Sequence, residues 1–346
     1  MIKMSPVLKE LNKKRDIICT KVVFTGQHKD SLQQLSSLFA ITPDFFLDVM
    51  QHNQSLAELT AKLITNIDKI VLQEKPDWIV AQGDTTSVFV AALIALYHKI
   101  KFAHIEAGLR TFDKYSPFPE EFNRFVSGYI ADVHFAPTAQ AVENLKSEKV
   151  ESKKIILTGN TGIDALLDIT NTPIKLDFKV PDNKKIILIT THRRENFNEL
   201  DTIFKEILNI ATTYPDVHIF YPVHMNAMIS KKAYAMLANI ANIELLPPLD
   251  YINFVHLMKM CDLILTDSGG VQEEAPTFGI PVLIMRKTTE RPEGVQAGVA
   301  KLIGNKNILE AFTAYHQNNF AKHNIPNPYG DGKAAQRIVD FFLSQC

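Results

Sequence analysis

Short apolar runs alternate with longer segments in which apolar residues recur at helical spacing, and this alternation continues along the whole chain. The short runs are typical of buried parallel strands, and the helical recurrence is typical of amphipathic helices. In the first half, the pattern predicts strands at residues 21–25, 78–81, 102–105, 133–136 and 155–157. Helices are predicted to begin at the Ser5-Pro6 cap and to cover residues 56–72, 88–97 and 120–131.

The second half repeats this arrangement after an interruption at residues 171–183, which carry two prolines and charges of both signs. Strands are predicted at 185–190, 217–221, 243–246 and 263–265, and helices at 200–211, 231–241, 251–260 and 334–343. Strands that alternate with helices form parallel sheets covered on both faces. We therefore expect an α/β protein of two Rossmann-like, doubly wound domains, residues 1–170 and 171–332, with residues 333–346 packing back on the first.

Polar residues gather at the carboxyl ends of the predicted strands: Asp84, Glu106, His192, His224 and Ser268. In two tandem domains of this kind, these ends converge on the cleft between the domains, where ligands bind. Any one of the five could be a helix cap or a loop contact. Five residues placed alike in both domains favour a functional site in the interdomain cleft.

The stretch 263–285 contains the strongest single signal, a strand followed by a glycine turn and a short helix. Ser268, Gly269 and Gly270 place a hydroxyl and unobstructed backbone N–H groups at the start of that helix, where an anion such as phosphate is stabilised. Glu274, one helical turn further on, could accept hydrogen bonds from sugar hydroxyls. The alternative is a tight turn that binds nothing.

Three carboxylates, those of Asp84, Glu106 and Glu120, are expected near the same cleft. Like charges and desolvation would raise the pKa of each, which suits general acid–base chemistry near neutral pH. His192, with Arg193 and Arg194, adds cationic or donor groups that could contact a phosphate, although arginines at helix starts are also often solvated.

The composition narrows the class of protein. With 346 residues, 46% of them hydrophobic, the chain is long enough for two domains, and its net charge of −1 predicts neither nucleic-acid nor anionic-membrane binding. Cys19, Cys261 and Cys346 are far apart and lack metal-ligand spacing, which indicates reduced thiols in a cytoplasmic protein. Residues 1–15 hold no signal-peptide core, and the longest apolar run, 88–97, is too short to span a bilayer.

Two motifs point elsewhere and are set aside. Residues 330–335 fit the dinucleotide pattern G-x-G-x-x-A, but no strand precedes them. Residues 97–101 have the Y-x-x-x-K spacing of NAD-dependent epimerases and dehydrogenases, but no glycine fingerprint lies upstream. With no Walker motif and no His/Cys cluster in the sequence, we expect no cofactor and no metal site.

Seven motifs together resemble one family, the non-hydrolysing bacterial UDP-N-acetylglucosamine 2-epimerases. They are QGDTTS at 82–87, HIEAGLRT at 104–111, YSPFPEEFNR at 115–124, THRRENF at 191–197, TDSGGVQEEAP at 266–276, TTERPE at 288–293 and NPYGDG at 327–332. The resemblance implies a GT-B-like fold, a homodimer, and no redox cofactor or required metal. It also implies interconversion of UDP-N-acetylglucosamine and UDP-N-acetylmannosamine for cell-surface polysaccharide synthesis.

The same resemblance implies a role for individual residues. Asp84, Glu106 and Glu120 match the family's acid–base carboxylates. For the diphosphate, the matching residues are Ser268, Gly269 and Gly270, with His192 near them. Glu274 matches the residue at the ribose, and Phe254 and the Leu249 backbone match the contacts of uracil. Lys3 matches a lysine near the phosphates, and Arg291 matches a residue at the nucleotide end of the cleft. His224 is expected among the substrate-binding residues.

The mechanism implied is anti elimination of UDP to give bound 2-acetamidoglucal, followed by addition of UDP while a proton reaches C2 from the other face. Two faces require two proton-handling groups, which explains several carboxylates. Gln27-His28 resembles the start of a segment that binds a second, activating UDP-N-acetylglucosamine in some members, although Lys29-Asp30-Ser31 departs from that pattern.

Two other functions remain open from the sequence. One is a hydrolysing 2-epimerase or an epimerase for a diacetamido uronic acid, against which the forms AGLR at 107–110 and HRR at 192–194 argue. The other is a fold that only binds nucleotide sugar, as a regulator.

The resemblance also predicts something before residue 1. The chain begins inside what would be the family's first helix, whereas members carry an earlier strand and a Gly-Thr-Arg-Pro-Glu turn. A doubly wound domain should also open with a strand, and losing a central strand leaves neighbouring backbone groups unpaired. We expect this chain to be an N-terminally shortened form that is unstable or nearly inactive until the strand is restored.

Overall fold

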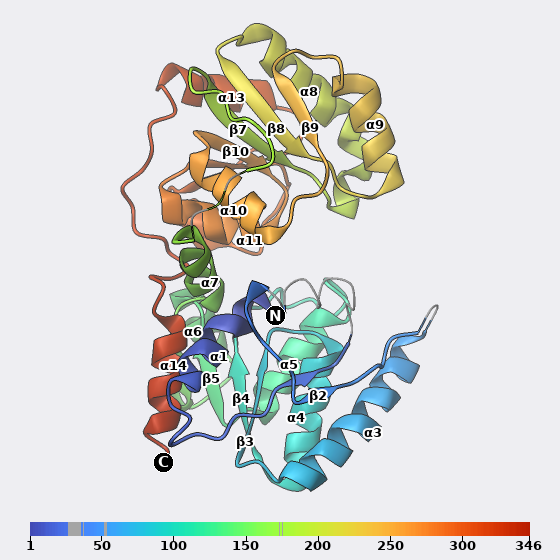
Figure 1. Ribbon diagram of the computed structural model, residues 1–346, viewed down its shortest axis with the longest axis vertical. Helices are drawn as coiled ribbons and strands as arrows, with labels where there is room; N and C mark the ends of the chain where they lie inside the picture. Colours follow the sequence, from blue (N-terminus) through green and yellow to red (C-terminus); the bar gives the residue numbers. More distant parts are fainter. Residues whose placement is uncertain (27–35, 37, 52–53, 173, 175) are drawn as a thin grey trace. The chain divides into compact units, whose positions relative to one another are not determined.

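The computed structural model describes residues 1–26, 36, 38–51, 54–172, 174 and 176–346 (Figure 1). Gln27 and His28, the predicted activator contacts, lie outside the described residues. The chain divides into two compact units, which we call unit 1 (residues 1–165 and 330–346) and unit 2 (residues 166–329). The division falls inside helix α7 (Thr161–Thr170), whereas the sequence placed it in the segment 171–183.

Unit 1 alternates strands and helices. Its strands are β1 (Val23–Phe24), β2 (Phe45–Phe46), β3 (Trp78–Gln82), β4 (Lys101–Ile105), β5 (Val133–Ala136) and β6 (Ile155–Leu157). Its helices are η1 (Ile2–Met4), α1 (Ser5–Asn12), α3 (Leu56–Glu74), α4 (Thr86–His98), α5 (Glu120–Ile130), α6 (Ala139–Ser147), η2 (Ser152–Lys154), the first part of α7, and α14 (Ala334–Leu343).

The main sheet of unit 1 is parallel, in the order β3-β4-β5-β6, and has helices on both faces. Alternation along β4 produces this layering, because successive side chains point to opposite faces. Phe102 packs with α4, whereas Ala103 and Ile105 pack with α1 and α14. Helices α1 and α14 come from opposite ends of the chain and lie side by side (Figure 1). Trp78 of β3 packs edge-on against the rings of Phe341 and Phe342 in α14.

The strand predicted at 21–25 is wrong in extent. Only Val23 and Phe24 form a strand, and they pair with Phe45–Phe46, a strand that the apolar pattern did not predict. A strand is defined by its hydrogen-bonded partner, and this partner is two residues long, so the pairing ends where the partner ends.

Unit 2 repeats the α/β alternation. Its strands are β7 (Lys185–Thr190), β8 (Val217–Pro222), β9 (Ile243–Leu246), β10 (Leu263–Thr266), β11 (Val282–Ile284) and β12 (Ala300–Leu302). Its helices are η3 (Arg194–Glu199), α8 (Leu200–Thr213), α9 (Ala227–Leu237), α10 (Tyr251–Met260), α11 (Gly269–Glu274), η4 (Ala275–Phe278), α12 (Pro292–Gln296) and α13 (Ile308–Gln317). The strands form one parallel sheet in the order β12-β11-β10-β7-β8-β9.

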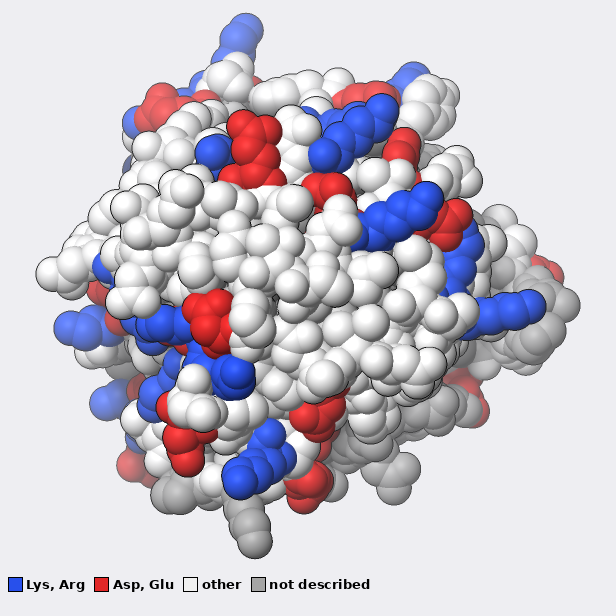
Figure 2. All heavy atoms as spheres, turned by 90° about the horizontal axis from the view of Figure 1, so that it is seen from above, with Lys and Arg blue, Asp and Glu red and all other residues white. Residues whose placement is uncertain are grey.

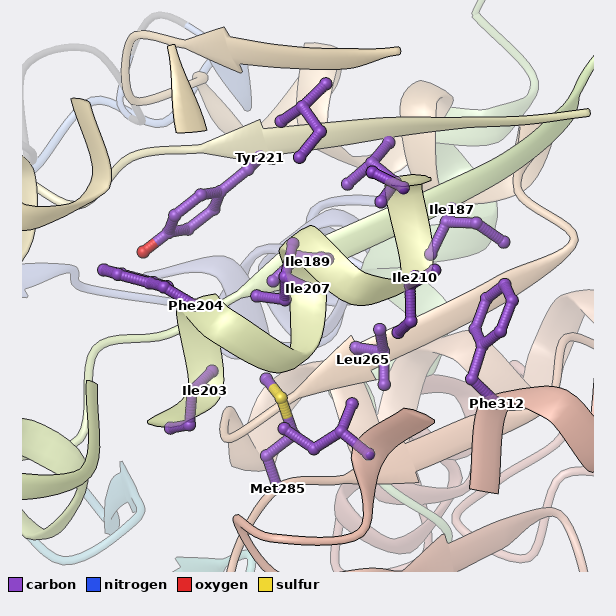
Figure 3. Close-up of a cluster of buried hydrophobic side chains, with 14 of the residues drawn as sticks. Ile187, Ile189, Ile203, Phe204, Ile207, Ile210, Tyr221, Leu265, Met285 and Phe312 are labelled. Atoms are coloured by element: carbon purple, nitrogen blue, oxygen red, sulfur yellow. The ribbon is translucent and has the colours of Figure 1, made fainter. Parts of the chain in front are cut away.

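Two apolar layers cover this second sheet. On one face, Ile203, Phe204 and Ile207 of α8 pack against Ile189 of β7 and Leu265 of β10 (Figure 3). The other face packs against α10 and the α11–η4 segment. Both sheets therefore have the doubly wound, parallel arrangement expected from the sequence. In the sheet of unit 2, the strand order brings the ends of β10, β7 and β8 together.

One predicted helix of unit 2 is displaced along the chain. The apolar pattern predicted a helix at 231–241, whereas α9 begins at Ala227 and ends at Leu237. The Asn226 side chain accepts a hydrogen bond from the Met228 N–H and caps the helix there. A local capping hydrogen bond therefore determines where α9 begins, and the spacing of apolar residues alone does not predict it.

Candidate functional site

In unit 1, Asp84 and Glu106 follow the carboxyl ends of two neighbouring strands. Gln82, the last residue of β3, is in register with Ile105, the last residue of β4. Because parallel strands end at the same sheet edge, the residues that follow them meet there. The strand order therefore brings two of the predicted catalytic carboxylates to one edge of the sheet.

Glu106 is held by side chains that are distant in sequence. Lys3 Nζ donates to Glu106 Oε1, and Gln82 Nε2 donates to Glu106 Oε2. The aliphatic stem of Lys3 also passes over Gly162, at the start of α7, where a Cβ would lie 3.5 Å from Lys3 Cε. The structure thus brings together Lys3 and Glu106, which the resemblance assigned to phosphate binding and to acid–base chemistry.

Asp84 has a different cation partner, Arg124 of α5. Arg124 donates from Nε and Nη2 to Asp84 Oδ2, at 2.9 and 2.7 Å, and from Nη1 to Glu121 Oε2 at 3.0 Å. Burial by itself would lower the pKa of Arg124, but the two carboxylates outweigh burial and raise it. Asn123 fixes the backbone of the same turn by donating to the Asp84 carbonyl at 2.8 Å.

Glu120, the third predicted carboxylate, is the first residue of α5. Its Oε2 atom is buried and has no hydrogen-bond partner among the described residues. The sequence predicted that the three carboxylates would raise one another's pKa, and it did not predict the cations that the fold places beside two of them, Lys3 at Glu106 and Arg124 at Asp84. Lys3 and Arg124 belong to two different helices, so the periodicity of one segment cannot predict that they lie beside these carboxylates.

His104, two residues before Glu106, supports the turn that carries Asp84. The ring lies buried in β4, and its Nε2 bonds to the Gly83 carbonyl at 2.8 Å, so Nε2 carries the proton. Burial lowers the pKa of His104 to about 4, which keeps the imidazole neutral. Gly83 has a φ of 87°, a conformation that side chains rarely adopt, so this turn requires a glycine.

In unit 2, His192 and Asp267 follow the neighbouring strands β7 and β10, whose last residues, Thr190 and Thr266, are in register. Asp267 is fully buried and lies 3.0 Å from His192 Nδ1. It also accepts hydrogen bonds from the backbone N–H groups of His192 and Arg193. Asp267 was not among the predicted site residues, although it lies at a strand end as they do.

His224 follows β8, and its ring stacks on that of His192 with centroids 6.2 Å apart and 26° between the planes. The Asn226 N–H donates to His224 Nδ1 at 3.1 Å. A nitrogen that accepts a hydrogen bond has no proton, so this bond places the ring proton on Nε2. The structure thus brings together His192 and His224, both predicted from the strand ends.

The glycine turn after β10 has two glycines in different surroundings. A Cβ on Gly269 would lie 2.5 Å from Cζ of Arg291, so the guanidinium packs directly on this glycine. A Cβ on the exposed Gly270 would meet only Ser268 Oγ, at 3.9 Å. Arg291 is held by Glu273 through a 2.8 Å hydrogen bond from its Nε. Ser268, Gly269, Gly270 and Arg291 therefore form one group at the start of α11.

Glu274 lies one turn along α11 and is held by a tyrosine. Tyr251 Oη donates to Glu274 Oε1 at 2.9 Å, and burial together with this carboxylate raises the pKa of Tyr251. Phe254, on the same helix α10, and Leu249, just before it, are partly buried and pack against the same apolar cluster. These three predicted nucleotide contacts are thus carried by α10 and α11.

Residues of the motif at 327–332 form hydrogen bonds that support the group at the start of α11 without belonging to it. Asn327 Nδ2 donates to the Glu273 carbonyl at 2.8 Å, and Tyr329 Oη donates to the Arg291 carbonyl at 3.1 Å. The Gly294 N–H donates back to Tyr329 Oη at 2.9 Å. These bonds join the Arg291 loop to α11, and no pattern in the sequence predicted them.

The surface carries charges of both signs. On the face shown in Figure 2, basic and acidic side chains lie interspersed and neither sign gathers into a continuous patch. Within the described part of the chain, no helix has the length and apolar character needed to cross a lipid bilayer.

Comparison with known proteins identifies the family. A family model described as UDP-N-acetylglucosamine 2-epimerase matches residues 9–343. A UDP-N-acetylglucosamine 2-epimerase from Neisseria meningitidis is 45% identical over 357 residues, covering 99% of this chain and 96% of the relative. A protein of that name from Campylobacter jejuni is 43% identical over 361 residues, covering 99% and 94%.

A solved structure agrees with these relatives. The crystal structure of the Neisseria meningitidis enzyme bound to UDP-N-acetylglucosamine has a TM-score of 0.90 and 44% identity, covering 99% of this chain and 96% of that one. Doubly wound parallel sheets with polar groups at their strand ends define an α/β protein of the GT-B-like class. Within that class, the chain belongs to the UDP-N-acetylglucosamine 2-epimerase family.

Proposed function

We propose that this chain interconverts UDP-N-acetylglucosamine and UDP-N-acetylmannosamine without hydrolysis and supplies cell-surface polysaccharide synthesis. The observation that carries the proposal is its likeness, over nearly its whole length, to a relative whose crystal structure contains UDP-N-acetylglucosamine. The seven motifs on which the sequence resemblance rests lie within the matched residues 9–343.

The reaction divides into elimination and addition. In the first step a carboxylate takes the C2 proton, a C1–C2 double bond forms, and the C1–O electron pair leaves with UDP. In the second step a proton is delivered to C2 from the opposite face while the UDP oxygen bonds to C1 again. The net change is one inverted centre, with no oxidation, and it requires one proton-handling group on each face.

Unit 1 supplies the proton-handling groups in this proposal, namely Asp84, Glu106 and Glu120. The bonds from Arg124 to Asp84 and from Lys3 to Glu106 hold two of the carboxylates in fixed orientations. A fixed orientation matters because a general base must meet its proton within hydrogen-bonding distance. Glu120 Oε2, buried without a partner among the described residues, is available to a substrate hydrogen.

Unit 2 supplies the nucleotide contacts. Ser268, Gly269 and Gly270 take the diphosphate, and the open side of Gly270 leaves room for a phosphate oxygen at the backbone. Arg291 and His192 neutralise the charge that develops on the departing UDP. Glu274, held by Tyr251, accepts from the ribose hydroxyls, and Phe254 with the Leu249 backbone packs on uracil. His224 is a further substrate-binding residue of this unit, and unit 1 adds Lys3 as a contact of the phosphates.

Exchange of the C2 proton with solvent tests the proposal. The protein is incubated with UDP-N-acetylglucosamine in deuterated water, and the C2 proton is followed by NMR. Epimerisation predicts deuterium at C2 of both sugars together with appearance of UDP-N-acetylmannosamine. Release of free N-acetylmannosamine and UDP would identify a hydrolysing enzyme instead. Absence of deuterium uptake by folded protein that binds the substrate would identify a nucleotide-sugar-binding regulator and reject the proposal.

We also propose that two copies associate through α5. Phe122, Phe125 and Tyr129 lie at i, i+3 and i+7, hence on one helix face, and their exposed fractions are 47%, 57% and 88%. Phe118, just before the helix, is 60% exposed. An exposed apolar face of this extent marks an interaction site, and a second copy can bury it symmetrically because the same face meets itself.

The three free cysteines fit a reducing compartment, the cytoplasm.

A further inference from the structure

The buried carboxylate of Asp267 collects hydrogen-bond donors from one short segment, residues 192–196. Its Oδ2 atom accepts from the backbone N–H groups of His192 and Arg193 and from Asn196 Nδ2, all at 3.0 Å. Its Oδ1 atom lies 3.0 Å from His192 Nδ1. Asn196 is itself held by Asn305, which donates to Asn196 Oδ1 at 2.9 Å. The His192 N–H also lies 3.1 Å from Oδ1, so the two oxygens share that donor, whereas Arg193 and Asn196 bond to Oδ2 and the imidazole faces Oδ1.

This division of partners determines the protonation of the histidine. Burial alone would raise the pKa of Asp267, but the bonds from His192 and from the two backbone N–H groups outweigh burial and lower it. An ionised carboxylate only accepts hydrogen bonds. The nitrogen that faces Oδ1 must therefore be a donor, which places a proton on His192 Nδ1 and leaves Nε2 for other partners.

We propose that Asp267 is a positioning residue that keeps a proton on Nδ1 of His192 and thereby makes Nε2 the nitrogen that meets the departing diphosphate. This inference rests on the proposed function, in which His192 is a catalytic residue. As the C1–O bond breaks, its electron pair goes to the diphosphate oxygen, and the imidazolium form of His192, which keeps one proton on Nδ1 and carries a second on Nε2, donates from Nε2 to that oxygen. The carboxylate on the far side of the ring stabilises the imidazolium during this step.

The neighbouring His224 has the opposite arrangement. Its Nδ1 accepts from the Asn226 N–H, so its Nε2 carries the proton. In the stacked pair, His192 is held by a hydrogen bond that its Nδ1 donates, whereas His224 is held by a hydrogen bond that its Nδ1 accepts. Of the two rings, His192 is the one that lies beside a carboxylate, 3.0 Å from Asp267 Oδ1. The proton that is donated to the departing diphosphate is accordingly assigned to His192.

Asp267→Asn separates the positioning role from a structural one. The Arg193 N–H and Asn196 Nδ2 both donate to Oδ2, so the amide oxygen must occupy that position and the NH₂ group must replace Oδ1. The amide then donates to His192 Nδ1, which reverses the tautomer and moves the proton to Nε2. Asp262→Asn is the matched control, because Asp262 lies at the other end of β10 and accepts the Ile186 N–H at 2.8 Å with no histidine bonded to it in the described structure.

Nitrogen NMR of the full chain, labelled with [¹⁵N]histidine, measures the tautomer directly. The His192 signals are identified by their loss in His192→Gln, and spectra are recorded at about pH 8.5, where an ordinary imidazole is neutral. We expect a protonated Nδ1 in the wild type and in Asp262→Asn, and a protonated Nε2 in Asp267→Asn. A wild-type His192 ring that carries its proton on Nε2 and none on Nδ1 would overturn the proposal, and this measurement remains decisive even if Asp267→Asn fails to fold.

Kinetics of the same variants test the consequence. We expect Asp267→Asn to lower kcat by about 10²–10⁴-fold, the range that general acid–base groups contribute, while KM and UDP affinity change far less. Asp262→Asn should keep the wild-type kcat. A wild-type kcat in Asp267→Asn, or equal losses in kcat and UDP affinity, would also overturn the proposal. If the wild type shows the expected tautomer but no C2 exchange, the proposed function fails and the positioning of His192 by Asp267 stands.

Discussion

At the scale of single residues, Glu106 has an uncommon backbone. Its φ of 64° lies in the left-handed region, which a residue with a Cβ rarely occupies. Such conformations persist where surrounding contacts hold them, and they cluster at functional sites. The bonds from Lys3 and Gln82 are contacts of this kind. The strain at Glu106 thus supports its assignment to the reaction, because a purely structural position would accommodate glycine or asparagine more readily.

Asp84→Asn tests a proton-handling role. The amide keeps the shape of the side chain but cannot take a proton, so we expect kcat to fall by about 10²–10⁴-fold while UDP affinity measured by calorimetry stays close to that of the wild type. Glu120→Gln should behave in the same way. Asp77→Asn, at the opposite end of β3, is the control and should keep full turnover. A parallel loss of turnover and UDP binding in Asp84→Asn would contradict the role.

The two glycines of the turn make a second residue-level prediction. Gly270→Val should abolish UDP binding with little loss of stability, because its side chain would enter open space beside the backbone N–H groups. Gly269→Ala should instead reduce stability as well, because its Cβ would displace the Arg291 guanidinium. Calorimetry with UDP and urea unfolding measure the two effects. Unchanged UDP affinity in Gly270→Val would show that the phosphate site lies elsewhere.

At the scale of elements, helix α5 combines two functions on opposite faces. Asn123 and Ser127 are buried, and Arg124 reaches the Asp84 carboxylate from the same side of the helix. Phe125 and Tyr129 are exposed. The helix that positions a proposed catalytic carboxylate thus also carries the proposed surface for a second copy, so an association through this face would restrain the helix on both sides.

Strands β4 and β5 make the stability of the protein dependent on pH. His104 and His134 are in register, and burial lowers the pKa of His104 to about 4 and of His134 to about 3. Their pKa in the unfolded chain is near 6.5, so between about pH 6.5 and 4 the unfolded chain binds protons that the folded chain does not. The stabilisation is therefore complete above pH 6.5 and is lost as the pH falls.

Urea unfolding between pH 7.5 and 4.5 checks this expectation. The free energy of unfolding should fall with decreasing pH by up to about 1.4 kcal/mol per pH unit for each histidine. His134→Gln should make that dependence shallower by about one histidine's share. Burial would raise the pKa of Glu290, but the bond from Arg286 outweighs it and lowers the pKa from 4.5 to about 2. The effect of Glu290 therefore begins only at the lower end of this window, and both proteins share it. Identical slopes in the two proteins would contradict the assignment to His134.

At the scale of the whole molecule, each unit has a core and a set of strand-end groups of its own. The clusters around α8 and α10 belong to unit 2, and those around α1, α14 and α4 belong to unit 1. The ends of the chain are both in unit 1, where α1 and α14 pack together. Substitutions in one set of strand-end groups should therefore leave the core of the other unit intact.

The proposed association predicts a change in oligomeric state. Phe125→Asp combined with Tyr129→Asp should convert a dimer to a monomer in analytical ultracentrifugation, because burying two unpaired carboxylates per copy in an apolar interface is unfavourable. Met225→Asp, which replaces a side chain that is 82% exposed in unit 2, should leave the dimer intact. A double variant that sediments as the wild type does would place the interface elsewhere.

The sequence by itself determined the class of fold and the location of the chemistry. Alternating periodicity predicted the parallel sheets, and the polar residues that follow apolar strands predicted Asp84, Glu106, His192 and Ser268 as members of the site. The inference about the fold succeeds because it depends on local spacing, since a strand shows its burial in its own residues. The membership of the site stays a prediction, and it too rests on a local feature, a glycine turn that offers its own backbone N–H groups to an anion. For the same reason, six of the strands and helices predicted from periodicity in unit 2 have observed bounds close to the predicted ones, for example α10 at Tyr251–Met260.

Only the tertiary structure decided which partner each site residue has. Arg124 reaches Asp84 across 40 positions, and Asp267 reaches His192 across 75, so no local pattern could connect them. The short pairing of β1 with β2 and the start of α9 at its Asn226 cap were likewise decided by specific hydrogen bonds rather than by apolar spacing. Periodicity measures burial, which is nearly independent of the partner, whereas an ion pair or a tautomer depends on the one atom that the fold brings within about 3 Å.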